Sequence, residues 1–88
     1  MRRLRDLRSV GPATVRDLAR LGIHDVDALA PHEATALYER LGHLDGAPHD
    51  PCVLDVLRCA VAQAQDPALP AVQRDWFWWS RLRKSGKP

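Results

Sequence analysis

Features typical of secreted, membrane-spanning and disulfide-rich proteins are missing from this sequence of 88 residues. Its longest apolar runs are a few residues, whereas roughly 20 are needed to cross a bilayer. The first residues, MRRLRDLRS, lack the apolar stretch of a signal peptide. Two cysteines are a weak disulfide signal in such a chain. We therefore expect one small cytoplasmic domain with no membrane partner.

Catalytic motifs are also absent. No nucleophile–base pair, Walker-type loop or spaced carboxylate dyad stands out, and a chain this short has little room for both a core and a closed active site. Metal ligands do gather in one segment, but their spacing matches no standard zinc pattern. These residues are His43, Asp45, His49, Asp50 and Cys52. We interpret the segment as a solvated polar loop and expect no enzymatic activity, cofactor, metal or small-molecule substrate.

The net charge of +2 hides a segregated distribution. Residues 1–24 carry six Arg against two Asp, which sums to +4. Residues 25–73 carry two Arg against eight acidic residues, which sums to −6, and residues 74–88 carry five basic residues against one Asp, again +4. Two basic ends around an acidic middle indicate a protein that meets a polyanion with one surface.

Apolar positions recur every three or four residues with almost no period-2 alternation, which predicts an all-α fold. Pro12 is well placed to open a helix, Gly22 to end it, and Asp50 to cap the longest one. The predicted helices lie near residues 4–7, 12–21, 26–30, 31–41 and 51–65. We expect a helical domain over residues 1–66, with a loop at 42–51, and a Trp-rich basic tail over residues 67–88.

The turn over residues 9–12 is a candidate phosphate-binding site. It precedes a helix, whose first N–H groups are unpaired at the positive end of its dipole. Gly11 would let the backbone approach a phosphate and would tolerate positive φ, and the surrounding arginines would add attraction. The candidate contacts are Arg8, Ser9, Val10, Gly11, Ala13, Thr14, Arg16 and Arg20. Auxiliary contacts are Arg3, Arg5, Arg81, Arg83 and Lys84.

The segment LRSVGPAT at residues 7–14 resembles a helix-hairpin-helix motif, the DNA-binding unit of many repair and recombination proteins. Ser9 stands where many such turns have their first glycine, and Ala13 where a lysine is common. Residues 21–23, 37–41 (LYERL) and above all 50–61 (DPCVLDVLRCAV) resemble the bacterial pathogenicity locus (Cdd1) family, some of whose members are called mitomycin resistance proteins.

This resemblance covers about residues 4–80 and extends to the paired tryptophans. It implies a small helix-hairpin-helix (SAM-like) bundle of about five short helices, in which a second hairpin at residues 42–51 is degenerate and acidic. It also implies a setting in DNA repair, recombination or damage tolerance.

The aromatic residues near the C-terminus have two readings. Trp76, Phe77, Trp78 and Trp79 could stack on unpaired bases, with the three tryptophans as the foremost candidates for stacking or an interface. Two or three of these rings could instead cover a small core. Cys52 and Cys59 are seven residues apart on one predicted helix, so their Cα atoms would be about 10 Å apart and could not be bridged. We expect both to be buried or half-buried thiols.

Together these patterns predict a non-sequence-specific DNA-binding protein of the bacterial nucleoid that grips backbone phosphate. Whether duplex, single-stranded or branched DNA is preferred stays open. The alternative is a protein-interaction adaptor, as a homodimer or with another protein, that uses the Trp-rich tail and the acidic middle. A third hypothesis is a thiol- or metal-dependent stress protein centred on Cys52 and the loop from His43 to Asp50.

Overall fold

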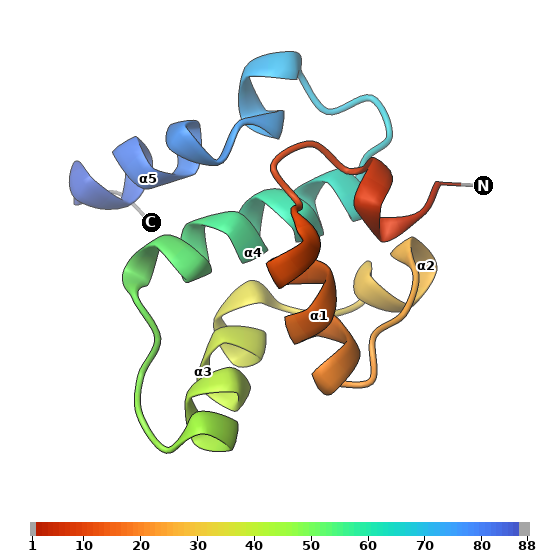
Figure 1. Ribbon diagram of the computed structural model, residues 1–88. Helices are drawn as coiled ribbons and strands as arrows, with labels where there is room; N and C mark the ends of the chain where they lie inside the picture. Colours follow the sequence, from red (N-terminus) through yellow and green to blue (C-terminus); the bar gives the residue numbers. More distant parts are fainter. Residues whose placement is uncertain (1, 87–88) are drawn as a thin grey trace.

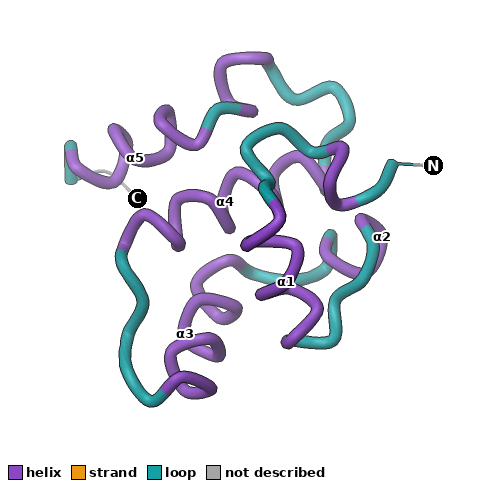
Figure 2. Tube along the Cα trace, viewed as in Figure 1, coloured by secondary structure: helices purple, strands orange, loops and turns teal. Residues whose placement is uncertain are grey.

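The computed structural model describes residues 2–86, which contain helices and loops and no strand (Figures 1 and 2). The predicted all-α fold is therefore confirmed. Lys87, part of the predicted basic tail, lies outside the described residues. The elements are the 3₁₀ helix η1 (Leu4–Asp6), α1 (Pro12–Arg20), α2 (Val26–Leu29), α3 (Ala34–Asp45), α4 (Pro51–Gln65), the 3₁₀ helix η2 (Ala71–Arg74) and α5 (Trp76–Lys84).

Helix α4 is the centre of the fold. The Asp50 carboxylate accepts the Cys52 N–H at 2.8 Å and Pro51 occupies the first turn, so the predicted cap is present. Helix α3 packs on one side of α4, while α5 runs antiparallel to it on another (Figure 1). Helix α4 is thus covered by neighbours along most of its circumference.

One apolar cluster joins these elements. Leucines at helical spacing supply most of it, and each fully buried leucine contributes roughly 2 kcal/mol. Its fully or almost fully buried members are Leu18, Ile23, Leu29, Leu37, Leu41, Leu57 and Ala60. Leu4, Leu7 and Val10 belong to the same cluster, so the N-terminal segment is anchored in the core.

The loop before α4 is shorter than predicted. Helix α3 begins at Ala34 and continues through Gly42 to Asp45, and Gly46 ends it with φ +72°. Gly42 does not break the helix; a Cβ there would lie 3.4 Å from the carbonyl oxygen of Ala47, so the glycine lets the loop fold back closely. The expected loop at residues 42–51 is therefore wrong in its first four residues, which are helical.

The C-terminal segment folds back onto α4 as η2 and α5. Asp75 caps α5 by accepting the Phe77 N–H at 3.0 Å. Arg83 donates from Nε and Nη2 to the carboxylate of buried Asp55, at 2.9 and 3.0 Å. Among residues 2–86, no helix is long and apolar enough to span a membrane.

Candidate nucleic-acid interface

The turn over residues 9–12 is fixed from beneath by α4. Gln63, which is buried, accepts the Arg8 N–H through Oε1 at 2.9 Å and donates from Nε2 to the Arg8 carbonyl at 2.7 Å. This side-chain amide pairs with the backbone as a neighbouring strand would. Leu7 and Val10 on either side are buried. The Arg8 side chain itself is exposed, so the turn presents it to solvent.

Ser9 ties the same turn to the C-terminal segment. Its hydroxyl donates to the Arg74 carbonyl at 3.0 Å and accepts the Trp76 N–H at 3.1 Å. Ser9 has φ +69°, the one positive φ of a non-glycine residue within 2–86. Gly11, by contrast, has φ −93°, so the turn does contain a positive φ, but at Ser9 and not at the glycine. Ser9 is therefore the left-handed position of the turn.

Helix α1 begins at this turn without a side-chain cap among the described residues. Gly11 is its N-cap residue and has no side chain to offer, and Pro12 at the first position has no N–H. Ala13 is exposed and Thr14 half-buried. A Cβ built on Gly11 would meet nothing within 4 Å, so the surface above the helix terminus is open. The positive end of α1 thus faces solvent.

Two hollows flank the turn, and Val10 and Gly11 line both. The first has a volume of about 460 Å³ and is lined by Arg5, Val10, Gly11, Pro12, Val15, Arg16 and Ala19. We call it the arginine hollow. The second, of about 480 Å³, is lined by Arg8, Ser9, Val10, Gly11, Asp75, Trp76 and Phe77. We call it the aromatic hollow.

Three arginines around the turn are free to meet an anion. Arg5, Arg8 and Arg16 have exposed side chains and form no salt bridge with any of the described residues. Arg5 and Arg16 line the arginine hollow and Arg8 lines the aromatic hollow. Positive charge therefore stands on both sides of the uncapped helix terminus.

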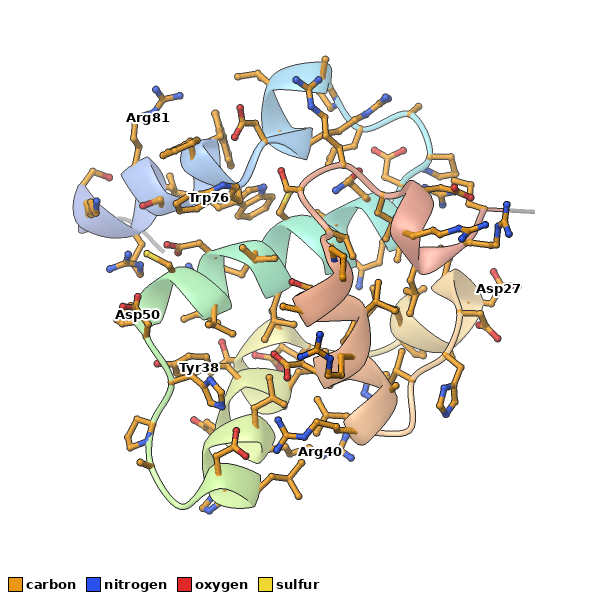
Figure 3. The ribbon with its side chains drawn as sticks, viewed as in Figure 1. Asp27, Tyr38, Arg40, Asp50, Trp76 and Arg81 are labelled. Atoms are coloured by element: carbon orange, nitrogen blue, oxygen red, sulfur yellow. The ribbon has the colours of Figure 1, made fainter. Side chains whose placement is uncertain are left out.

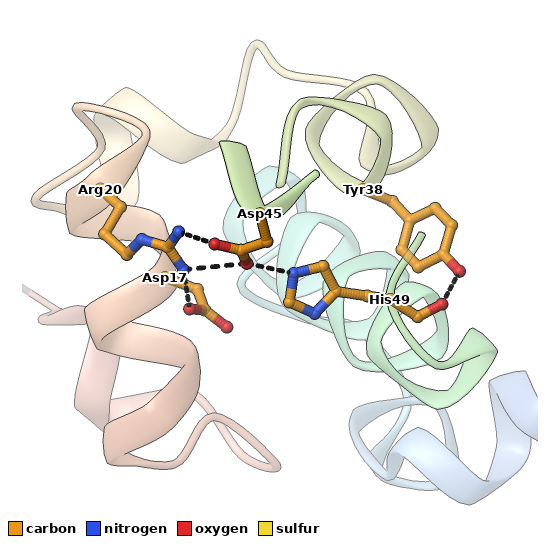
Figure 4. Close-up of polar contacts among 5 residues, drawn as sticks. All are labelled: Asp17, Arg20, Tyr38, Asp45 and His49. Atoms are coloured by element: carbon orange, nitrogen blue, oxygen red, sulfur yellow. Dashed lines mark hydrogen bonds and ion pairs between the residues drawn. The ribbon is translucent and has the colours of Figure 1, made fainter. Parts of the chain in front are cut away.

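Other predicted contacts are already engaged within the protein. Arg20 donates to Asp17 at 3.2 Å and to both carboxylate oxygens of Asp45 (Figure 4). This hydrogen bonding raises the pKa of Arg20 and lowers that of Asp45. Arg3 lies 3.9 Å from Asp6, and Arg83 is held by Asp55. Arg3, Arg20 and Arg83 are thus paired with carboxylates of the protein, unlike the three free arginines.

Arg81 and Lys84 are exposed on α5, and Arg81 projects away from α4 (Figure 3). The aromatic residues divide into two pairs. Trp76 stacks on Phe77 with ring centroids 4.1 Å apart, and Trp78 meets Trp79 edge to face at 4.9 Å. Trp79 donates from Nε1 to the Gln73 carbonyl at 2.8 Å and is half-buried, as is Trp78.

The residues around the loop that precedes α4 form hydrogen bonds with one another. His49 Nε2 lies 2.6 Å from Asp45 Oδ2, and the Tyr38 hydroxyl donates to the His49 carbonyl (Figure 4). Within residues 2–86, no group of three or more His, Cys, Asp or Glu is placed to hold a metal ion. Cys52 is half-buried and Cys59 buried, as predicted, and both are free thiols.

Gln63 was not among the predicted contacts, and Phe77 was predicted only as one of four aromatic residues that could stack on bases or pack in the core. Gln63 follows Cys59 by one helical turn, and its burial could have been suspected only if the C-terminal segment were known to cover that face. Phe77 had a clearer signal, because Asp75 directly before an aromatic run is a helix-capping pattern. That pattern predicts a helix that holds Phe77 beside Trp76.

These features define a small all-helical domain with free arginines around an N-terminal turn. The chain belongs to the pathogenicity locus (Cdd1) family, whose model matches residues 1–85. It is similar to the mitomycin resistance protein McrB of Streptomyces lavendulae, with 37% identity over 81 residues that cover 92% of this chain and 73% of that protein. No solved structure gives a significant match.

Proposed function

We propose that this protein binds DNA without sequence specificity and grips backbone phosphate at the turn over residues 9–12. The observation that carries the proposal is the set of free arginines, Arg5, Arg8 and Arg16, around an uncapped helix terminus. A helix N-terminus attracts phosphate through its unpaired N–H groups and its dipole. Cationic side chains beside it add the electrostatic attraction that dominates nonspecific DNA binding.

The arginine hollow is the site for phosphate. It brings together the start of α1 and the side chains of Arg5 and Arg16, and no carboxylate lines it. Gly11 leaves the approach open, since a side chain at that position would project into free space above the turn. Contacts to phosphate carry no base information, so binding of this kind is independent of sequence.

The engaged arginines stand outside this interface. Arg20 and Arg83 are compensated by carboxylates, and their removal would cost structure more than affinity. Arg81 and Lys84, exposed on α5, would add weaker attraction that salt screens readily. The interface therefore centres on the turn, with α5 at its margin.

DNA repair, recombination or damage tolerance is the proposed setting, and the nucleoid the proposed location. The name of the Streptomyces lavendulae relative, which assigns that protein to mitomycin resistance, supports damage tolerance in particular. The domain would then act as a DNA-binding module and not as an enzyme.

The test is a salt titration of the binding of a labelled DNA duplex, followed by fluorescence anisotropy. For the wild type, affinity should fall steeply with salt. Arg16→Gln should weaken binding and reduce the slope of log K against log salt by about 1. Arg20→Gln is the matched control, because it removes the same charge from a compensated position in the same helix. Equal losses in both variants, or no wild-type binding to any DNA even at low salt, would overturn the proposal.

Gly11→Val tests the close approach of the backbone. Gly11 has φ −93° and ψ 179°, which valine adopts readily, and nothing surrounds the new Cβ within 4 Å. Circular dichroism should therefore show unchanged helix content. Duplex affinity should fall about tenfold or more, since the valine occupies the space that a phosphate would enter. Full affinity in this variant would show that the phosphate-binding site is not at the turn.

A further inference from the structure

We propose that the aromatic hollow receives an unpaired base while the arginine hollow holds a phosphate of the same strand, so that the preferred ligand is DNA with single-stranded nucleotides. This inference rests on the proposed function and names the class of DNA that the same surface selects. An intact duplex would reach the arginine hollow but would leave the aromatic hollow empty, because its bases are stacked on one another.

An exposed aromatic ring stands beside the turn. Phe77 is 57% exposed, more than any other large apolar side chain described, and its inner face is stacked on Trp76 at an interplanar angle of 27°. Trp76 projects from α5 toward the turn and α4 (Figure 3), and its main-chain N–H donates to the Ser9 hydroxyl. The main chain that carries the two rings is therefore fixed to the turn before any ligand arrives, which lowers the entropic cost of binding.

Charge divides the two hollows between base and phosphate. Asp75 lines the aromatic hollow together with Arg8 and offsets its charge, so a phosphate is attracted less there than in the arginine hollow. The same carboxylate has lone pairs left after it accepts the Phe77 N–H, and an amino or ring N–H group of a base can donate to them. Arg5 and Arg16 line the other hollow, which holds no acidic residue.

The aromatic hollow suits one base better than a protein partner. The other large exposed apolar side chains, Leu44 and Val72, do not line it, so the exposed apolar surface here is confined to one stacked pair of rings. A stable protein interface buries much more surface, about 800 Å² on each partner. Stacking of a base on an exposed aromatic ring needs only the ring face, and it tolerates every base.

The other tryptophans are less suited to this role. Trp79 uses its Nε1–H for the Gln73 carbonyl, and Trp78 packs edge to face against it. Both are half-buried. The structure therefore assigns stacking to Phe77 and Trp76.

The experiment compares three labelled ligands by anisotropy: a blunt duplex, the same duplex with a single-stranded extension, and the single strand alone. Wild-type protein should bind the extended duplex more tightly than the blunt one. Phe77→Ala should weaken binding of the extended duplex and the single strand by roughly 5- to 100-fold and leave the blunt duplex unchanged. Phe77→Trp should restore the preference. Leu44→Ala is the matched control, because Leu44 is 55% exposed and lies on α3.

The outcomes separate this inference from the proposed function. Equal wild-type affinity for blunt and extended duplexes would overturn the inference and leave phosphate binding standing. The same would follow if Phe77→Ala had no effect, or weakened all three ligands equally. Failure of the wild type to bind any of the three at low salt would instead overturn the proposed function. Circular dichroism of Phe77→Ala should match the wild type, since the ring is mostly exposed.

Discussion

Arg83 of α5 forms a bidentate salt bridge with Asp55 of α4, and the Asp55 carboxylate is completely buried. Nε and Nη2 of the arginine each donate to a different carboxylate oxygen. Such planar, paired contacts are stronger and more directional than those of a lysine. This contact holds the C-terminal helix on the centre of the fold.

Removal of Arg83 should be costly. Arg83→Leu would leave the Asp55 carboxylate buried without a counter-charge, and we expect the free energy of unfolding to fall by about 3 kcal/mol. Chemical denaturation measures this loss. Arg81→Leu, two residues away and exposed, should change the value by no more than about 0.5 kcal/mol. If the two variants were equally stable, the contact between Arg83 and Asp55 would not stabilise the fold. The double variant Asp55→Leu/Arg83→Leu should recover much of the loss, because no charge then remains buried.

Ser9 should show two opposing effects. Ser9→Ala removes both hydrogen bonds of the hydroxyl but keeps a side chain at φ +69°, so it should lower the free energy of unfolding by about 1–2 kcal/mol. Ser9→Gly loses the same bonds but relieves the left-handed backbone, and it should be more stable than the alanine variant by about 1 kcal/mol. Chemical denaturation of the two variants gives the order. An alanine variant as stable as the glycine variant would show that the positive φ carries no strain.

Asp45 should make the protein sensitive to acid. Its pKa is lowered by the hydrogen bond from Arg20, and next by that from His49. A carboxyl group with a lowered folded-state pKa stabilises the fold above its unfolded value, about pH 4, and this contribution is lost as the pH falls through the folded value. The midpoint of unfolding should therefore depend less on pH below about 4 in Asp45→Asn than in the wild type. Asp27→Asn serves as the control, since Asp27 is exposed and its side chain forms no salt bridge with the described residues. An unaltered pH profile in Asp45→Asn would show that the Asp45 carboxylate does not cause the loss of stability in acid.

The two cysteines should differ in reactivity. Burial raises the pKa of Cys59 to about 11, and its sulfur lies 3.4 Å from Nε2 of Gln63. The pKa of half-buried Cys52 is also raised, chiefly by its hydrogen bond with the Asp50 side chain. At a pH of about 8, a thiol reagent should label Cys52 slowly and Cys59 only after denaturation, because the thiolate is the reactive form. Cys52→Ala should abolish the native reaction, whereas Cys59→Ala should leave it unchanged. Rapid labelling of both thiols in the native protein would contradict the burial of Cys59.

Local signals predicted much of the helical framework. Pro12, Gly22 and the Asp50–Pro51 pair stand at the observed helix ends, because capping and proline geometry act within a few residues. Gly42 misled the prediction of the loop. Its role is to admit the neighbouring loop backbone, and a sequence cannot distinguish that role from helix termination.

The polar residues of α4 show the limit of periodicity. Asp55 and Gln63 are polar residues within α4, yet both are buried, because α5 and the turn cover them. Their partners, Arg83 and the Arg8 backbone, are 28 and 55 residues away in sequence. Charge segregation drew attention to the arginines as a group, but only the structure separates Arg16, which forms no salt bridge with the described residues, from Arg20, which is paired with Asp45.

The pairing of Gln63 with Arg8 has a consequence for variation at position 8. Gln63 contacts only the main chain of that residue, and the arginine side chain is exposed. The fold therefore places no demand on which side chain stands there. An exchange of arginine for lysine, glutamine or an acidic residue at position 8 should therefore leave the turn intact, so the charge of this surface can change independently of the stability of the domain.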